Sequence, residues 1–140
     1  MPESEIRIAV VGAGQIGKRH AELIVKSDAC RLAAIVDPAP AVADYAGTLG
    51  VPHHASLAEL FASERPDGVI LATPNQMHCD QALACIAAGV PTLVEKPVAH
   101  TLEAGMRLCD AADAAKVPVL VGHHRRHGSI MARAIEVIES

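Results

Sequence analysis

Aromatic side chains are almost absent from this chain. Its 140 residues include no tryptophan, one tyrosine (Tyr45) and one phenylalanine (Phe61). Since 51% of the residues are nonetheless apolar, the core must be built from Val, Ile, Leu and Ala, as in parallel strands that are covered on both faces. This apolar content excludes a disordered chain, and the length fits a single domain.

Strong charge of either sign is missing too. The formal net charge is −4, which provides no broad basic surface, so we expect neither nucleic acid nor a membrane as a partner. No apolar run approaches the ~18 residues of a membrane span, and the acidic N-terminus lacks the basic start of a signal peptide. The four cysteines form no C-x-x-C pair and are expected to be reduced thiols. These absences predict a soluble, cytoplasmic protein.

Short runs rich in Val, Ile and Leu alternate with helical patterns along the whole chain. The candidate strands are Ile6–Val11, Arg31–Asp37, Gly68–Thr73, Thr92–Glu95 and Val117–Gly122, with a weaker one at 53–55. The candidate helices are Gln15–Lys26, Ala39–Leu49, Leu57–Ser63, Gln76–Ala88, Leu102–Ala115 and Ile130–Ile138. Ser56 and Thr101 are expected to cap helices, and Gly50 and Gly89 to end them. The alternation predicts an α/β fold with a doubly wound parallel sheet, the three-layer α/β/α arrangement called the Rossmann fold.

A glycine-rich loop follows the first candidate strand and opens the first candidate helix. Its sequence is Gly12-Ala13-Gly14-Gln15-Ile16-Gly17, a complete G-x-G-x-x-G. In this context Gly12 would permit the tight turn, Gly14 the close approach of backbone to a pyrophosphate, and Gly17 the close packing of the helix. The pyrophosphate would bind the free N–H groups at Gln15 and Ile16, at the positive end of the helix dipole.

Asp37 ends the second candidate strand. A carboxylate about 20 residues after the glycines accepts hydrogen bonds from the adenosine ribose hydroxyls in such folds. The following residues, 38–42, include no basic side chain that could neutralise a 2′-phosphate, so NAD is favoured as the cofactor over NADP. The alternative, an ordinary βα turn followed by a turn aspartate, is disfavoured by the joint context of strand, loop, helix and carboxylate.

Three further motifs occur in a recognisable order. They are Thr73-Pro74-Asn75-Gln76-Met77-His78, Glu95-Lys96-Pro97 and Val121-Gly122-His123-His124-Arg125-Arg126. With the glycine-rich loop, this order and spacing resembles the glucose–fructose oxidoreductase / inositol dehydrogenase (Gfo/Idh/MocA) family, over essentially the whole chain. The combination of T-P-N-x-x-H with a later E-K-P is specific, whereas either motif alone would not be.

The resemblance implies a role for the residues at the strand ends. Lys96 matches the lysine that hydrogen-bonds the substrate hydroxyl and helps to move its proton, and Glu95 matches a residue that lines the nicotinamide pocket. In open α/β sheets the ligand lies beyond the carboxyl ends of the strands, where both residues are expected. The alternative for Lys96 is a surface lysine before a turn proline. The resemblance also predicts a cis peptide bond before Pro97.

Other positions are matched less directly. By the resemblance, Thr73, Pro74 and Asn75 form the loop along the nicotinamide ribose, His78 lies near that pocket, and Arg126 is a loop arginine facing cofactor or substrate. His78 has a strong alternative as a helix-cap or packing residue. A metal site at the three histidines of 123–127 is disfavoured because no carboxylate or cysteine lies near them in sequence. The histidines at 20, 53, 54 and 100 are expected to be solvated or locally bonded.

The activity implied by the resemblance is an NAD-dependent oxidoreductase that transfers a hydride between nicotinamide and a hydroxyl of a sugar, inositol or related polyol. Family members continue into a second α/β domain that covers the nicotinamide and binds substrate, and nothing in this sequence corresponds to it. Residues 1–127 are therefore expected to form the Rossmann domain, and 128–140 the start of a connection.

This chain alone is expected to bind cofactor without appreciable dehydrogenase activity. An apolar docking surface near the terminal helix would favour a homo-oligomer. Two alternatives stay open: a non-catalytic dinucleotide-binding module or sensor, and an NADP-linked reductase of the same family.

Overall fold

The computed structural model describes residues 5–140, with every side chain in that range except that of Arg126. Six parallel strands form one sheet in the order β3-β2-β1-β4-β5-β6. The strands are β1 Ile6–Val11, β2 Cys30–Val36, β3 His53–His54, β4 Gly68–Leu71, β5 Thr92–Glu95 and β6 Val119–Gly122. The expected parallel α/β sheet is confirmed.

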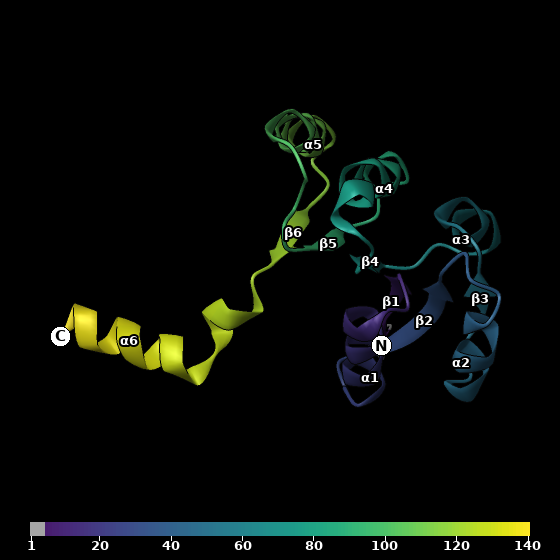
Figure 1. The fold of residues 1–140 in the computed structure, drawn as a ribbon, viewed down its shortest axis with the longest axis horizontal. Coiled ribbons are helices and arrows are strands. Elements are labelled where there is room, and N and C mark those ends of the chain that lie inside the picture. Colours follow the sequence, from purple (N-terminus) through teal and green to yellow (C-terminus); the bar gives the residue numbers. More distant parts are fainter. Residues whose placement is uncertain (1–4) are drawn as a thin grey trace.

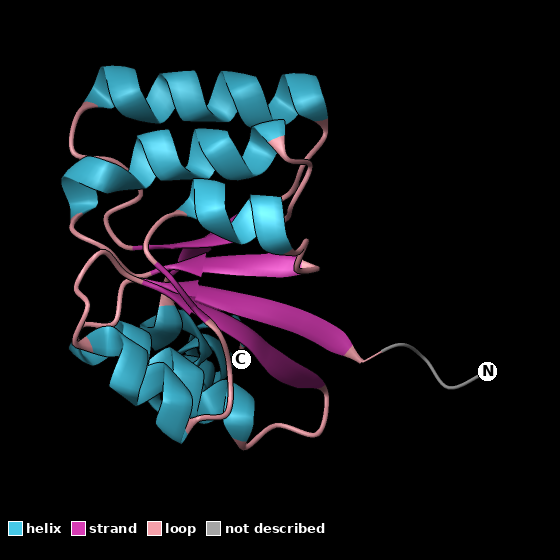
Figure 2. Ribbon diagram, turned by 90° about the vertical axis from the view of Figure 1, so that its right-hand side faces the viewer, coloured by secondary structure: helices cyan, strands magenta, loops and turns pink. Residues whose placement is uncertain are grey.

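Helices cover both faces of the sheet, as Figure 2 shows. They are α1 Gln15–Val25, α2 Val42–Thr48, α3 Leu57–Ser63, α4 Asn75–Ala87, α5 Leu102–Ala115 and α6 Ser129–Glu139. One core cluster packs α1 and α2 against Val10 and Ile35, and the other packs α3, α4 and α5 against Ala9 and Val11. Neighbouring residues of β1 thus face opposite layers, which is why its sequence is continuously apolar.

Several element boundaries differ from the expected ones. β4 ends at Leu71 rather than at Thr73. The Ala72 N–H still bonds the carbonyl of Val11, but the pairing of β4 with β1 stops at Leu71, opposite the last residue of β1. The first turn expected for α2 is instead a pair of tight turns, in which Val42 and Ala43 donate to carbonyls three residues earlier. A 3₁₀ helix, His124–His127, precedes α6 and was not expected.

The C-terminal edge of the fold is apolar and exposed. α6 has no buried residue and extends away from the other elements (Figure 1). Ile130 and Ile138 on α6 are 85% and 83% exposed, and Leu120 on β6 is 63% exposed. The apolar surface expected near the terminal helix is therefore present.

No helix within residues 5–140 combines the length and the apolar character needed to cross a membrane.

Candidate functional site

The glycine-rich loop is shaped by close contacts of two of its glycines. Gly12 has a φ of +90°, and a Cβ there would lie 2.7 Å from the carbonyl oxygen of Ala72. A Cβ at Gly17 would lie 1.7 Å from the carbonyl oxygen of Gly12. The tight turn expected at Gly12 is confirmed, and the close packing at Gly17 is packing of α1 against the loop itself.

Gly14 differs from the other two glycines because a Cβ there would meet no protein atom within 4 Å. It is the N-cap residue of α1 and has no side chain to bind the N–H groups of the first turn. The loop therefore keeps open space beside the first turn of α1, whose N–H groups, including those of Gln15 and Ile16, have no partner within the helix. Such donors at the positive end of a helix dipole are what a pyrophosphate requires.

Asp37 stands directly after β2 and lines the same part of the site. Its Oδ2 accepts a hydrogen bond from the Ala13 N–H at 2.8 Å, and its Oδ1 accepts one from the Ala39 N–H at 2.9 Å. An ionised carboxylate has about four acceptor positions, so two remain for hydroxyl groups. The two backbone contacts fix the direction of the carboxylate relative to the loop.

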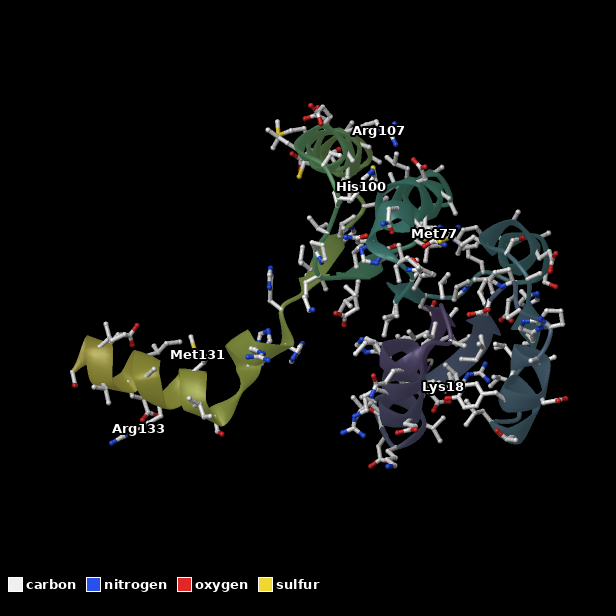
Figure 3. All side chains as sticks on the ribbon, viewed as in Figure 1. Lys18, Met77, His100, Arg107, Met131 and Arg133 are labelled. Atoms are coloured by element: carbon white, nitrogen blue, oxygen red, sulfur yellow. The ribbon has the colours of Figure 1, made fainter. Side chains whose placement is uncertain are left out.

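Two cavities lie on either side of the loop that follows β4. The first, of about 660 Å³, is lined by Gly12, Gly14 and Asp37, together with Met77 of α4. Met77 projects from α4 on the side of α3, as Figure 3 shows. The second cavity, of about 420 Å³, is lined by residues from α1, from the start of α4 and from the end of β5: Ile16, His20, Asn75, His78, Glu95 and Lys96. Both cavities are also lined by Ala72 and Thr73, so they are neighbours, while Pro74 lines only the first.

His78 is 1% exposed and ties two loops together. Its Nε2 lies 2.8 Å from the carbonyl oxygen of Thr73, and its Nδ1 lies 2.8 Å from the carbonyl oxygen of Pro97. With both ring nitrogens engaged by backbone, His78 holds the loop after β4 against the turn after β5. This geometry favours the packing role among the two considered from the sequence.

Lys96 follows β5 and is exposed toward solvent, and its peptide bond to Pro97 is cis, as expected. It lines the second cavity and also a third one of about 540 Å³, to which His123, His124 and Arg125 contribute. The backbone of Arg126 lies in the 3₁₀ helix, but its side chain is outside the described residues. The structure thus brings Lys96 together with the loops after β4 and β6, at the carboxyl ends of the strands.

Glu95 has a partner that sequence reasoning missed. Its Oε1 lies 2.7 Å from Nε2 of His20, which comes from α1 and is 75 residues away in sequence. The expectation that His20 is solvated or locally bonded is therefore wrong. His20 lies one turn beyond the last glycine of the loop, so the helix that opens at the loop carries it to the end of β5; only this helical spacing could have indicated the contact.

The comparisons agree with this geometry. A family model described as an oxidoreductase family with an NAD-binding Rossmann fold (GFO_IDH_MocA) matches residues 6–123. The chain belongs to this family. It is therefore an NAD-binding Rossmann domain of the Gfo/Idh/MocA oxidoreductases, as its motifs indicated.

Three relatives illustrate the similarity. Rhizopine catabolism protein MocA of Rhizobium meliloti is 31% identical over 88% of this chain and 39% of its own length. Inositol 2-dehydrogenase of Rhodococcus erythropolis is 35% identical over 87% of this chain and 36% of its own length. The structure of scyllo-inositol dehydrogenase from Lactobacillus casei with bound NAD(H) and scyllo-inositol superposes with a TM-score of 0.92 and 26% identity, over 97% of this chain and 41% of that one. The chain thus spans about two fifths of the length of these relatives.

Proposed function

We propose that this chain is the cofactor-binding part of a dehydrogenase that oxidises a hydroxyl group of an inositol, a sugar or a related polyol with NAD. The observation that carries the proposal is the pair of adjoining cavities, one beside the glycine-rich loop with Asp37 and one with Lys96. Two of the relatives are inositol dehydrogenases by name. We also propose that residues 128–140 begin the connection to the part of the protein that completes the site.

The residues present fit a dinucleotide in one orientation. The adenosine half would occupy the 660 Å³ cavity, with its ribose hydroxyls donating to Asp37, and the pyrophosphate would bind at Gly14 and the first turn of α1. The nicotinamide half would then enter the 420 Å³ cavity beside Asn75 and Lys96. The shared lining of the two cavities supports a single ligand that spans both.

We assign to Lys96 the transfer of the proton that leaves the substrate hydroxyl. Oxidation of an alcohol removes a hydride from carbon and a proton from oxygen, and bound NAD supplies the hydride acceptor. The Nζ of Lys96, when it carries only two protons, can accept the hydroxyl proton and pass it to the solvent that reaches this exposed side chain. Glu95 and Asn75 line the same cavity and would orient the ligand.

The test replaces Lys96 by alanine in a version of the protein that has the length of its relatives. Turnover of an inositol or sugar should fall about 10²- to 10⁴-fold, the usual contribution of general acid–base catalysis, while the Kd for NAD stays unchanged. Lys26→Ala, at the far end of α1, is the matched control and should change neither quantity. Turnover within about tenfold of the unaltered protein would remove Lys96 from the chemistry.

A further inference from the structure

Glu95 and His20 form a contact that joins two layers of the fold. Their side chains are only 12% and 23% exposed, and the 2.7 Å distance between Oε1 and Nε2 is that of a strong, charge-assisted hydrogen bond. α1 covers one face of the sheet, and β5 lies two strands away from β1. The pair therefore fixes the carboxylate at a position that neither element defines alone.

Gly122, the last residue of β6, also borders the carboxylate of Glu95. It pairs with Glu95 across the sheet, and a Cβ on it would lie 3.0 Å from both Cδ and Oε1 of Glu95. Any side chain at 122 would press on the carboxylate. Glu95 is thus confined between a glycine on one side and an imidazole on the other.

The charges around the pair are otherwise positive or neutral. Among the described residues that line the 420 Å³ cavity, Glu95 is the single carboxylate. Arg19 of α1, Lys96 after β5, His78 of α4 and His124 of the 3₁₀ helix line it as well. Arg19 is 63% exposed and lies 3.7 Å from Glu22 outside the cavity, so its charge is largely screened by solvent.

We propose that Glu95, held in place by His20, makes this site bind oxidised nicotinamide more tightly than reduced nicotinamide. The inference rests on the proposed function, because it requires the nicotinamide in the 420 Å³ cavity. The oxidised ring carries a positive charge that the reduced ring lacks, so a fixed carboxylate in a partly dry cavity stabilises the oxidised form selectively. His20 contacts the carboxylate through Nε2 and is a positioning residue in this scheme, since it acts through Glu95.

The experiment measures the Kd values of NAD⁺, NADH and ADP-ribose for the 140-residue chain at a single pH, by calorimetry and by NADH fluorescence. In Glu95→Gln the ratio of the NADH Kd to the NAD⁺ Kd should fall about two- to fivefold relative to the unaltered chain, the size expected for a partly exposed pair of charges. The Kd of ADP-ribose, which has no nicotinamide, should stay unchanged.

His20→Gln keeps an amide nitrogen that can donate to Glu95, whereas His20→Leu removes the hydrogen bond. The ratio should stay close to that of the unaltered chain in His20→Gln and fall toward that of Glu95→Gln in His20→Leu. His100→Gln, outside the cavity, is the matched control and should leave the ratio unchanged. An unchanged ratio in Glu95→Gln or in His20→Leu would overturn the inference. Failure of all three ligands to bind would instead overturn the proposed function, and the inference with it.

Discussion

Asp37 is the residue that should decide between NAD and NADP. Asp37→Asn keeps the shape of the side chain and an acceptor for the Ala13 N–H, but it removes the negative charge. We expect the NAD Kd to rise about tenfold, as for a lost hydrogen bond to a charged group, and the NADP Kd to fall or stay constant because the repulsion of its 2′-phosphate is gone. Calorimetric titration of both cofactors measures this. Equal losses for the two would show that another group selects the cofactor.

The cysteines should differ sharply in reactivity. Burial raises the pKa of the Cys85 thiol to about 11, with a smaller opposing effect of its hydrogen bond to Thr92, whereas Cys109 is exposed. Since the thiolate is the nucleophile, iodoacetamide at pH 8 should modify Cys109 and leave Cys85 intact, as read by mass spectrometry of the folded chain. Above the ordinary thiol pKa, the unfolded chain loses the Cys85 proton before the folded chain does, so this group lowers stability as the pH rises toward 11. Equal labelling of both cysteines in the folded chain would contradict the burial argument.

At the scale of elements, the loop and α1 offer a matched pair of glycine substitutions. Gly17→Ala should destabilise the fold by about 1–3 kcal/mol or more, because its methyl group would overlap the Gly12 carbonyl. Gly14→Ala meets open space and should leave the midpoint of thermal unfolding nearly unchanged. It should nevertheless weaken NAD binding, since the methyl group would stand where the pyrophosphate approaches. Unchanged affinity in Gly14→Ala would place the pyrophosphate elsewhere.

Local signals in the sequence predicted most of these elements. The Ser56 hydroxyl accepts from the Glu59 N–H and the Thr101 hydroxyl from the Ala104 N–H, as their positions before helical patterns indicated. Gly50 and Gly89 adopt positive φ where helices were expected to end. Each of these features depends on residues within four positions of one another, which is why the sequence alone sufficed.

The features that the sequence did not predict depend on distant residues. α5 ends at Lys116 in the left-handed conformation without a glycine, and residues with a side chain such as lysine rarely adopt this conformation. The contact of His20 with Glu95 is set by how α1 lies across the sheet, and no local pattern encodes that. For the site, the tight turn at Gly12 was predicted from the sequence, whereas the ligand contacts of Gly14 and Asp37 and the side-chain roles around the nicotinamide stay predictions.

At the scale of the whole molecule, we expect binding without turnover. The 420 Å³ cavity opens beside an exposed Lys96, and hydride transfer requires the substrate carbon to be held against the nicotinamide, from which much of the rate comes. The 140-residue chain should therefore bind NAD but form no NADH with a panel of inositols, aldoses and sugar acids, followed by absorbance at 340 nm. Saturable turnover with any of them would show that the residues described here are sufficient.

The strand order has a consequence for how the protein keeps its fold. The chain crosses from β3 at one edge to β4 in the middle, so within the sheet the two βαβ halves are joined by the pairing of β1 with β4. The two cavities straddle this seam, since one is lined by β1, β2 and α3 and the other reaches β5. A dinucleotide bound across both cavities would contact both halves. At a free ligand concentration of about 100 times its Kd, such a ligand adds about 2.7 kcal/mol to the free energy of unfolding. A rising concentration of NAD would thus raise the free energy of unfolding of this chain as it fills the two cavities.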